Sequence, residues 1–232
     1  MKILVLDDSK AHREAARLTL KGHDVTIVDS YDEAQEALTP RKNYDLERAL
    51  QLKLLAEAGL PPNYKPNGRT DMSDEAKKCR EACAKATEQA TSYPDFDVVL
   101  TDLLMPPSLR AQGDKGMRFI GQEMPLGTTI ALLALTVGIK NVAVATDADH
   151  HDHPASAAFD RFRSRNTPSG VKVLCTNHVN FILFDEETWE PVEHAFLDTD
   201  EGKAKYPQVE WNQYTGIANG KDWGLILQQL LG

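Results

Sequence analysis

Two apolar stretches of this chain end in aspartates, and carboxylates at the ends of buried strands are groups that can do chemistry. The first stretch, residues 2–6, runs into the adjacent pair Asp7 and Asp8. The second, residues 97–101, runs into Asp102, and a Met-Pro pair follows three residues later. Runs of this kind are typical of parallel strands covered on both faces, and open α/β sheets place their functional groups at the carboxyl ends of such strands. The sequence therefore predicts a small acidic pocket at one edge of a parallel sheet.

Three carboxylates crowded at one sheet edge repel one another, and a hard divalent cation relieves that repulsion. Mg²⁺ prefers oxygen ligands in octahedral geometry and usually keeps several of its waters. The residue types at this edge therefore predict Mg²⁺ as the cofactor.

The elements around the two aspartate-ending strands alternate between strand and helix, with short connections. This alternation predicts an α/β protein with a doubly wound, five-stranded parallel sheet. The predicted strands are residues 2–7, 24–30, 97–102, 141–146 and 171–175. The predicted helices of this domain are residues 9–21, 30–38, 128–137 and 154–165, with a last helix over 223–231 that Asp222 caps.

Residues 39–94 interrupt this alternation and contain no convincing strand. Leu46, Leu50 and Leu54 recur every four residues, which predicts a helix over 45–58, and a second helix is predicted over 73–91. A Pro- and Gly-rich loop separates the two helices. The pattern predicts a helical hairpin inserted between two elements of the sheet domain. It would either bind a partner or simply decorate the sheet domain.

Composition excludes several classes of protein. The chain has 232 residues and a net charge of −9, with no long basic run, so nucleic acid is not an expected partner. Its longest apolar region, residues 126–139, is shorter than the ~18–20 residues of a membrane span, so no membrane association is expected. Three cysteines are too few for a disulfide scaffold, and the chain begins directly with a strand pattern. A cytoplasmic protein is expected.

The motifs at the predicted strand ends resemble those of a response-regulator receiver domain, the phospho-acceptor domain of two-component signalling. The acidic pair Asp7 and Asp8 matches the family's pair after the first strand. Asp102, followed by Leu-Leu-Met-Pro, matches the family's Asp-x-x-Met-Pro. Gly116 resembles the glycine that opens the third helix, and Thr146 ends the fourth strand at the family's Ser/Thr position.

The resemblance implies a flavodoxin-like receiver fold and a division of the chain. Residues 1–38 and 95–178 would form the receiver-like domain, and 39–94 the inserted hairpin. Residues 179–232 would form a C-terminal extension, loop-rich up to residue 220, whose last helix would complete the receiver-like domain.

The resemblance also implies roles for individual residues. Asp102 would accept a phosphoryl group, and Asp7 and Asp8 would hold Mg²⁺ together with the backbone carbonyl of Leu104, which chain position favours over Leu103. Thr146 would hydrogen-bond the phosphoryl group. The implied protein is a phosphoprotein of a phosphorelay whose partners are a sensor histidine kinase or phosphotransfer protein and an unknown output protein.

One departure from the family concerns its Lys-Pro pair at the end of the fifth strand. This chain has Thr176 and Asn177 there, and Lys172 lies four residues too early, toward the opposite end of the strand. Without the ammonium group, the phosphoryl group would lose a charge-assisted hydrogen bond of ~1–3 kcal/mol. Either weak phosphotransfer or a degenerate receiver that acts only as an interaction module would follow.

A second departure is the run Asp149-His150-His151-Asp152-His153. Imidazole and carboxylate groups suit Zn²⁺ or another transition metal, so His150, His151, His153 and Asp149 are a candidate second metal site. An ordinary polar loop explains the run equally well. One of these histidines could also replace the missing lysine as a cation, which would make the response sensitive to pH.

A metal-dependent phosphatase or hydrolase that uses the Asp cluster and the His-rich loop is the alternative from another class. A phosphatase of the haloacid-dehalogenase type would need Asp-x-Asp after the first strand, which Asp7-Asp8-Ser9 does not supply. The residues therefore favour a phospho-acceptor signalling domain over an enzyme with turnover.

Overall fold

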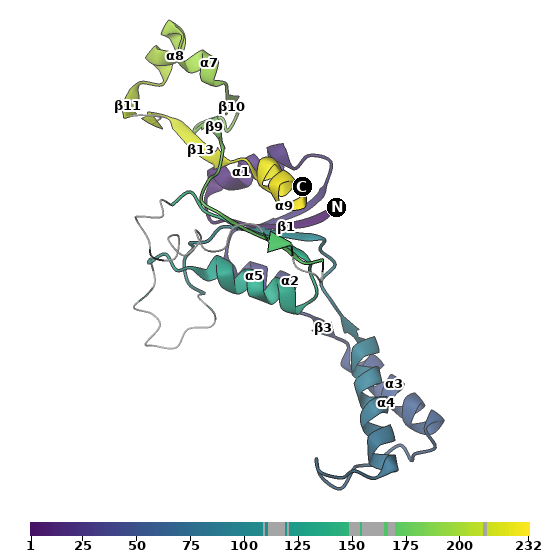
Figure 1. The fold of residues 1–232 in the computed structure, drawn as a ribbon. Coiled ribbons are helices and arrows are strands. Elements are labelled where there is room, and N and C mark those ends of the chain that lie inside the picture. The colour runs from purple at the N-terminus through teal and green to yellow at the C-terminus, as the bar shows by residue number, and fades with distance from the viewer. Residues whose placement is uncertain are drawn as a thin grey trace. The chain divides into compact units, whose positions relative to one another are not determined.

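The computed structural model describes residues 1–108, 110, 119, 121–148, 154, 165–166, 170–210 and 213–232 (Figure 1). The chain forms two compact units. Met1–Leu38 and Asp95–Gly232 make the first unit, and Thr39–Pro94 make the second.

The first unit is built on a sheet of five parallel strands with a short antiparallel strand at one edge. The parallel strands are β1 (Lys2–Leu6), β2 (Asp24–Val28), β5 (Val98–Thr101), β6 (Asn141–Ala145) and β8 (Lys172–Thr176), and the edge strand is β7 (Arg165–Asn166). The sheet order is β2-β1-β5-β6-β8-β7. The parallel strands thus follow the order 2-1-3-4-5, which is the order of flavodoxin-like folds. The prediction of a doubly wound five-stranded parallel sheet is confirmed.

Helices cover both faces of this sheet, which explains why its strands are apolar without alternation. Helices α1 (Lys10–Thr19) and α9 (Trp223–Leu231) lie on one face, and α2 (Tyr31–Leu38) and α5 (Leu126–Thr136) lie on the other (Figure 1). Successive side chains of a strand point to opposite faces. Ile3 and Val5 therefore pack in the core that contains Trp223, whereas Leu4 and Leu6 pack in the core that contains Ile130.

The strand register brings the aspartate-ending strands level with one another. Leu6 pairs with Thr101, and Thr101 pairs with Val144. The residues that follow these strands, Asp7 and Asp102, therefore leave the sheet at the same edge, and Thr146 leaves there one residue after β6.

The second unit is a helical hairpin of α3 (Tyr44–Glu57) and α4 (Asp74–Ala90), with the short strands β3 (Arg41–Lys42) and β4 (Thr91–Ser92) paired at its base. Asn43 and Ser73 cap the two helices by accepting hydrogen bonds from the Leu46 and Ala76 amides. A small core that includes Leu55, Leu60, Cys79 and Ala82 joins the helices.

The prediction that residues 180–220 are loop-rich was wrong. Strands β10 (Pro191–Val192), β9 (Phe181–Asp185) and β13 (Ile217–Lys221) form a three-stranded antiparallel sheet in that order. The remaining elements are α7 (His194–Leu197), α8 (Asp200–Lys205), β11 (Gln208–Glu210) and β12 (Gln213–Tyr214). Most of these elements are only two to six residues long, so they carry little periodicity in the sequence. We call residues 177–220 the C-terminal insertion.

The predicted helix over 154–165 falls almost entirely outside the described residues. Of the helices in the described part of the chain, none is both long enough and apolar enough to cross a membrane.

Candidate functional site

The three predicted carboxylates meet at the carboxyl edge of the parallel sheet. One side-chain oxygen from each of Asp7, Asp8 and Asp102 can be chosen so that all three lie within 4.8 Å of one another. Asp7 is fully buried, Asp102 is 6% exposed and Asp8 is partly exposed. The sequence therefore located this acidic cluster correctly.

Backbone hydrogen bonds fix the two strand ends that carry the cluster. The Asp102 amide donates to the Leu6 carbonyl at 2.9 Å, and the Asp7 amide donates to the Val28 carbonyl at 3.2 Å. Arg13 holds the turn after β1, because its Nη1 donates to the carbonyls of Asp7 at 2.9 Å and Asp8 at 2.6 Å.

A lysine that the sequence analysis missed lies in the middle of the cluster. The Lys221 side chain is fully buried, with Nζ at 2.6 Å from Asp102 Oδ1, 3.2 Å from Asp7 Oδ2 and 3.4 Å from Asp147 Oδ1. The prediction that the pocket has no lysine was wrong. Thr176 and Asn177 do follow the fifth parallel strand as predicted, but the ammonium group comes from elsewhere in the chain.

The C-terminal insertion explains how Lys221 reaches the pocket. Strand β8 ends at Thr176, the insertion follows, and its last strand β13 packs on α1 and ends at Lys221. Gly220 permits this packing, because a Cβ there would lie 2.6 Å from the Ala11 carbonyl oxygen. The next residue, Asp222, caps α9 by accepting a hydrogen bond from the Leu225 amide at 3.0 Å.

The sequence did carry a signal for this lysine. Lys221 directly precedes Asp222, the residue that the sequence predicts as the cap of the last helix. The search at the end of the fifth strand instead found Thr176 and Asn177, and it set Lys172 aside as four residues too early. As expected, Lys172 lies at the opposite end of the strand, where its Nζ donates to the Leu231 carbonyl.

Burial and charge set the protonation of this site. Burial raises the pKa of Asp102 to about 7; the nearby Lys221 opposes this rise and Asp7 adds to it. Burial and the charge of Asp7 also raise the pKa of Asp8. For Lys221, burial lowers the pKa, but the charges of Asp7, Asp102 and Asp147 outweigh it and raise the pKa above its ordinary value.

The donor set of the cluster suits a hard divalent cation. Among the described residues, the Lys221 ammonium group lies within 3.4 Å of the carboxylates of Asp7, Asp102 and Asp147, and Asp8 adds a fourth carboxylate to the cluster. The excess negative charge and the oxygen-only donors of the Asp7, Asp8 and Asp102 cluster fit Mg²⁺.

The segment after Asp102 turns sharply against the start of α5. The Leu103 carbonyl accepts a hydrogen bond from the Gly127 amide at 3.0 Å. A Cβ on Gly127 would lie only 1.8 Å from the Asp102 carbonyl oxygen, so the close approach requires glycine. Helix α5 begins at Leu126. The resemblance of Gly116 to the glycine that opens the third helix of a receiver domain stays a prediction. Gly116 itself lies outside the described residues.

Thr146 is buried beside the cluster, at the end of β6. Its amide donates to the Thr176 carbonyl at 3.0 Å, and its Oγ1 accepts a hydrogen bond from the Ala148 amide at 3.2 Å. These bonds tie the β6 strand end to β8.

A buried histidine, also missed from the sequence, supports Lys221 from helix α1. His12 Nδ1 accepts a hydrogen bond from the Lys221 amide at 3.1 Å, and His12 Nε2 lies 3.4 Å from Asp147 Oδ2. The His12 carbonyl accepts a hydrogen bond from Trp223 Nε1 at 3.1 Å. His12 thus links α1, β13 and α9 at the edge of the pocket.

The candidate second metal site stays a prediction. Asp149, His150, His151 and His153 all lie outside the residues that the structure describes, as does Asp152.

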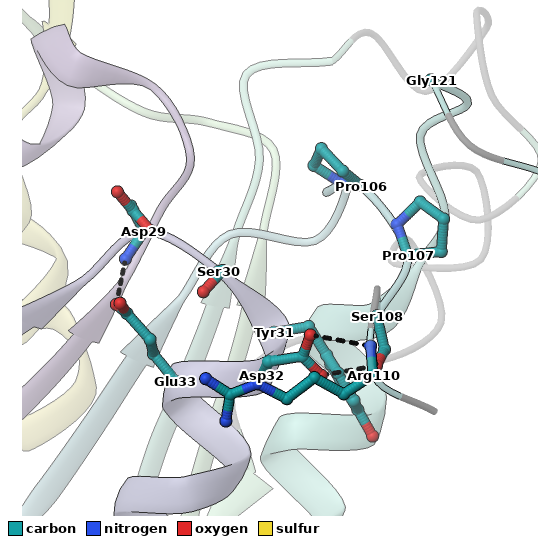
Figure 2. Close-up of a pocket in the computed structure, with 10 residues that line it drawn as sticks. All are labelled: Asp29, Ser30, Tyr31, Asp32, Glu33, Pro106, Pro107, Ser108, Arg110 and Gly121. Atoms are coloured by element: carbon teal, nitrogen blue, oxygen red, sulfur yellow. Dashed lines mark hydrogen bonds between the residues drawn. The ribbon is translucent and has the colours of Figure 1, made fainter. Parts of the chain in front are cut away.

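A separate cavity of about 320 Å³ lies between the start of α2 and the segment that follows Met105 (Figure 2). Ser108 donates a hydrogen bond to Asp32, and Arg110 Nη1 lies 3.2 Å from Glu36 Oε2. The acidic cluster does not line this cavity, whose described lining residues include Asp29, Tyr31 and Pro107. These contacts hold the segment that follows Met105 against α2, which is a local structural role.

Comparisons with known proteins add little to this geometry. No protein-family model matches the sequence, and no curated protein matches it. One solved structure that matches is the receiver domain of the histidine kinase CKI1 from Arabidopsis thaliana, complexed with Mg²⁺ and BeF₃⁻. The identity is 17%, the match covers 75% of this chain and 79% of that one, and the TM-score is 0.29. The flavodoxin-like character of the fold therefore rests on the strand order and the helix placement alone.

Proposed function

We propose that this chain is a receiver-like signal-transduction protein that accepts a phosphoryl group on Asp102 in a Mg²⁺-dependent reaction. The observation that carries this proposal is the Lys221 ammonium group, buried 2.6 Å from Asp102 Oδ1 and beside Asp7. A nucleophilic carboxylate, two further carboxylates and a lysine are the groups that a phospho-acceptor site requires.

The chain's own residues have distinct tasks in this reaction. An Asp102 carboxylate oxygen attacks the phosphorus of the donor and forms an acyl phosphate, while the bond from phosphorus to the donor breaks and the donor keeps its electron pair. Lys221 offers its ammonium group to the phosphoryl oxygens, where charge develops. Thr146 donates its hydroxyl to the same group.

The metal would be held by Asp7, Asp8 and Asp102. When bound, Mg²⁺ would neutralise negative charge on the transferring phosphoryl group. The Leu104 carbonyl is the proposed further ligand, and the bond between the Leu103 carbonyl and the Gly127 amide supports this choice because it commits the neighbouring carbonyl to α5.

The proposed partners are a sensor histidine kinase or phosphotransfer protein as donor and an output protein of unknown identity, in the cytoplasm. The hairpin of residues 39–94 and the C-terminal insertion are the proposed contact surfaces for such partners.

Incubation with Mg²⁺ and acetyl phosphate, followed by intact-mass measurement, tests the proposal. We expect the mass of one phosphoryl group to be added to the wild-type chain but not to Asp102→Asn. Asp97→Asn is a matched control, because Asp97 lies at the other end of β5, where its Oδ2 accepts a hydrogen bond from the Lys2 amide at 2.7 Å. This variant should accept the phosphoryl group.

Two other outcomes would replace the proposal. Tight Mg²⁺ binding without any adduct would indicate a degenerate receiver that acts as an interaction module. Steady turnover of a phosphate ester such as p-nitrophenyl phosphate would indicate a metal-dependent phosphatase.

A further inference from the structure

Asp147 is a fourth carboxylate at the site, and the proposed phosphoryl transfer does not use it. It follows Thr146 directly, and its side chain is 45% exposed, in contrast to the buried Asp7 and Asp102. Its two oxygens have different neighbours. Oδ1 lies 3.4 Å from Lys221 Nζ, and Oδ2 lies 3.4 Å from His12 Nε2.

The hydrogen bonds of His12 determine what it can do for Asp147. Its Nδ1 accepts a hydrogen bond from the Lys221 amide, so the imidazole proton is assigned to Nε2, which faces Asp147. A second proton on Nδ1 would point at an N–H group and cost that bond. His12 therefore orients Asp147 through Oδ2, while Oδ1 of the same carboxylate faces Lys221 Nζ.

The Lys221 ammonium group is consequently shared among three carboxylates before any phosphoryl group arrives. An acyl phosphate on Asp102 carries up to two negative charges near the same ammonium, in place of the single charge of the carboxylate. Asp102 and Asp7 are buried and remain in the site, whereas the half-exposed Asp147 can be repelled toward solvent.

We propose that Asp147, oriented by His12, is an internal competitor for Lys221 that weakens the hold of the site on a phosphoryl group. This inference rests on the proposed function. His12 is a positioning residue in it, because it acts through Asp147 and the Lys221 backbone. Loss of the Asp147 charge would then strengthen anion binding and lengthen the life of the acyl phosphate.

A purely structural role for Asp147 makes a different prediction. If Asp147 only stabilised the pocket, its replacement would loosen the site and weaken every ligand. Competition by charge instead changes cation and anion binding in opposite directions. Removal of a negative charge weakens the attraction of the site for Mg²⁺ and strengthens its attraction for an anion.

The test compares Asp147→Asn with the wild type. The asparagine keeps an oxygen that can accept from His12 Nε2 but lacks the charge. Mg²⁺ binding is measured by calorimetry. Binding of beryllofluoride, an anion that mimics a phosphoryl group on a carboxylate, is measured at saturating Mg²⁺ by tryptophan fluorescence, since the Trp223 ring lies 5.8 Å from Lys221 Nζ.

We expect Asp147→Asn to bind Mg²⁺ more weakly and beryllofluoride about tenfold more tightly, the effect of one partly screened charge. His12→Asn keeps an acceptor near the Lys221 amide but loses the donor to Asp147, so it should change both affinities in the same directions by less. Asp198→Asn, at an exposed residue after α7, is the matched control and should change neither affinity.

If the wild type binds beryllofluoride, weaker or unchanged binding by Asp147→Asn would overturn the inference about Asp147 and leave the proposed function standing. Failure of both proteins to bind it would overturn the proposed function together with the inference. Binding by Asp147→Asn but not by the wild type would support both.

Discussion

Replacement of Lys221 by methionine removes the cation around which the site is arranged. Nζ lies within 3.4 Å of three carboxylates, two of them buried, and the side chain is fully inaccessible to solvent. Loss of one partner of a buried ion pair costs about 3–5 kcal/mol, because the charges left behind are uncompensated. We expect the free energy of unfolding of the metal-free variant at pH 8 to be about 3 kcal/mol lower than that of the wild type. This value is at the lower end of the range because Asp147 is half exposed and partly solvated.

Mg²⁺ should reduce this loss. The carboxylates of the variant lack their ammonium partner, so they should bind the metal more tightly than the wild type does. A ligand at one hundred times its Kd adds about 2.7 kcal/mol to the free energy of unfolding. The stability difference between Lys221→Met and the wild type should therefore shrink as Mg²⁺ is added.

Urea unfolding with and without Mg²⁺, followed by tryptophan fluorescence, measures both effects. Trp189 and Trp223, the tryptophans that the structure describes, belong to the first unit, so their signal reports on the unit that contains the site. Lys172→Met is the matched control at the other end of the sheet. It loses one hydrogen bond to the Leu231 carbonyl, worth about 1 kcal/mol, and this loss relative to the wild type should not change when Mg²⁺ is added. Equal stability of Lys221→Met and the wild type, or a loss that Mg²⁺ does not change, would refute the reasoning.

Four further predictions rest on the same geometry. Because burial raises the pKa of Asp102 to about 7, Mg²⁺ must displace a proton below that pH, so its apparent affinity in calorimetry should rise about tenfold from pH 6 to pH 8. Between about pH 4 and pH 7 the Asp102 carboxyl holds a proton in the folded state but not in the unfolded state, so its contribution to metal-free stability should fall as the pH rises from about 4 to 7 and stay constant above pH 7. Gly220→Ala places a Cβ 2.6 Å from the Ala11 carbonyl oxygen; it should push β13 off α1, cost about 1–3 kcal/mol in urea unfolding and reduce phosphoryl acceptance by displacing Lys221. Gly127→Ala, whose Cβ would lie 1.8 Å from the Asp102 carbonyl oxygen, should cost at least as much and slow acceptance, as measured by intact mass over time.

The acidic cluster could be predicted from the sequence because residues that are close together in the sequence define each of its parts. Each strand is an apolar run that ends in an aspartate, and parallel strands bring their carboxyl ends to one edge whatever else the chain does. The helical hairpin was predictable for a similar reason, since Leu46, Leu50 and Leu54 repeat over several turns.

Lys221 could not be placed in the same way, because its position depends on a distant strand. The C-terminal insertion moves the lysine away from the fifth parallel strand and returns it through β13, which packs on α1. His12 was missed because nothing in its neighbourhood in the sequence distinguishes it from an ordinary helix residue. Its partners, Asp147 and Lys221, are brought together only by the fold.

The measurement that tests the central claim most directly is the location of the phosphoryl group. After reaction with acetyl phosphate and Mg²⁺, borohydride reduction converts a phosphorylated aspartate into homoserine, which peptide mass spectrometry can locate. The account predicts this conversion at Asp102, dependent on Mg²⁺ and reduced in Lys221→Met. Conversion at Asp7 or Asp8 instead, or none at any aspartate, would contradict it.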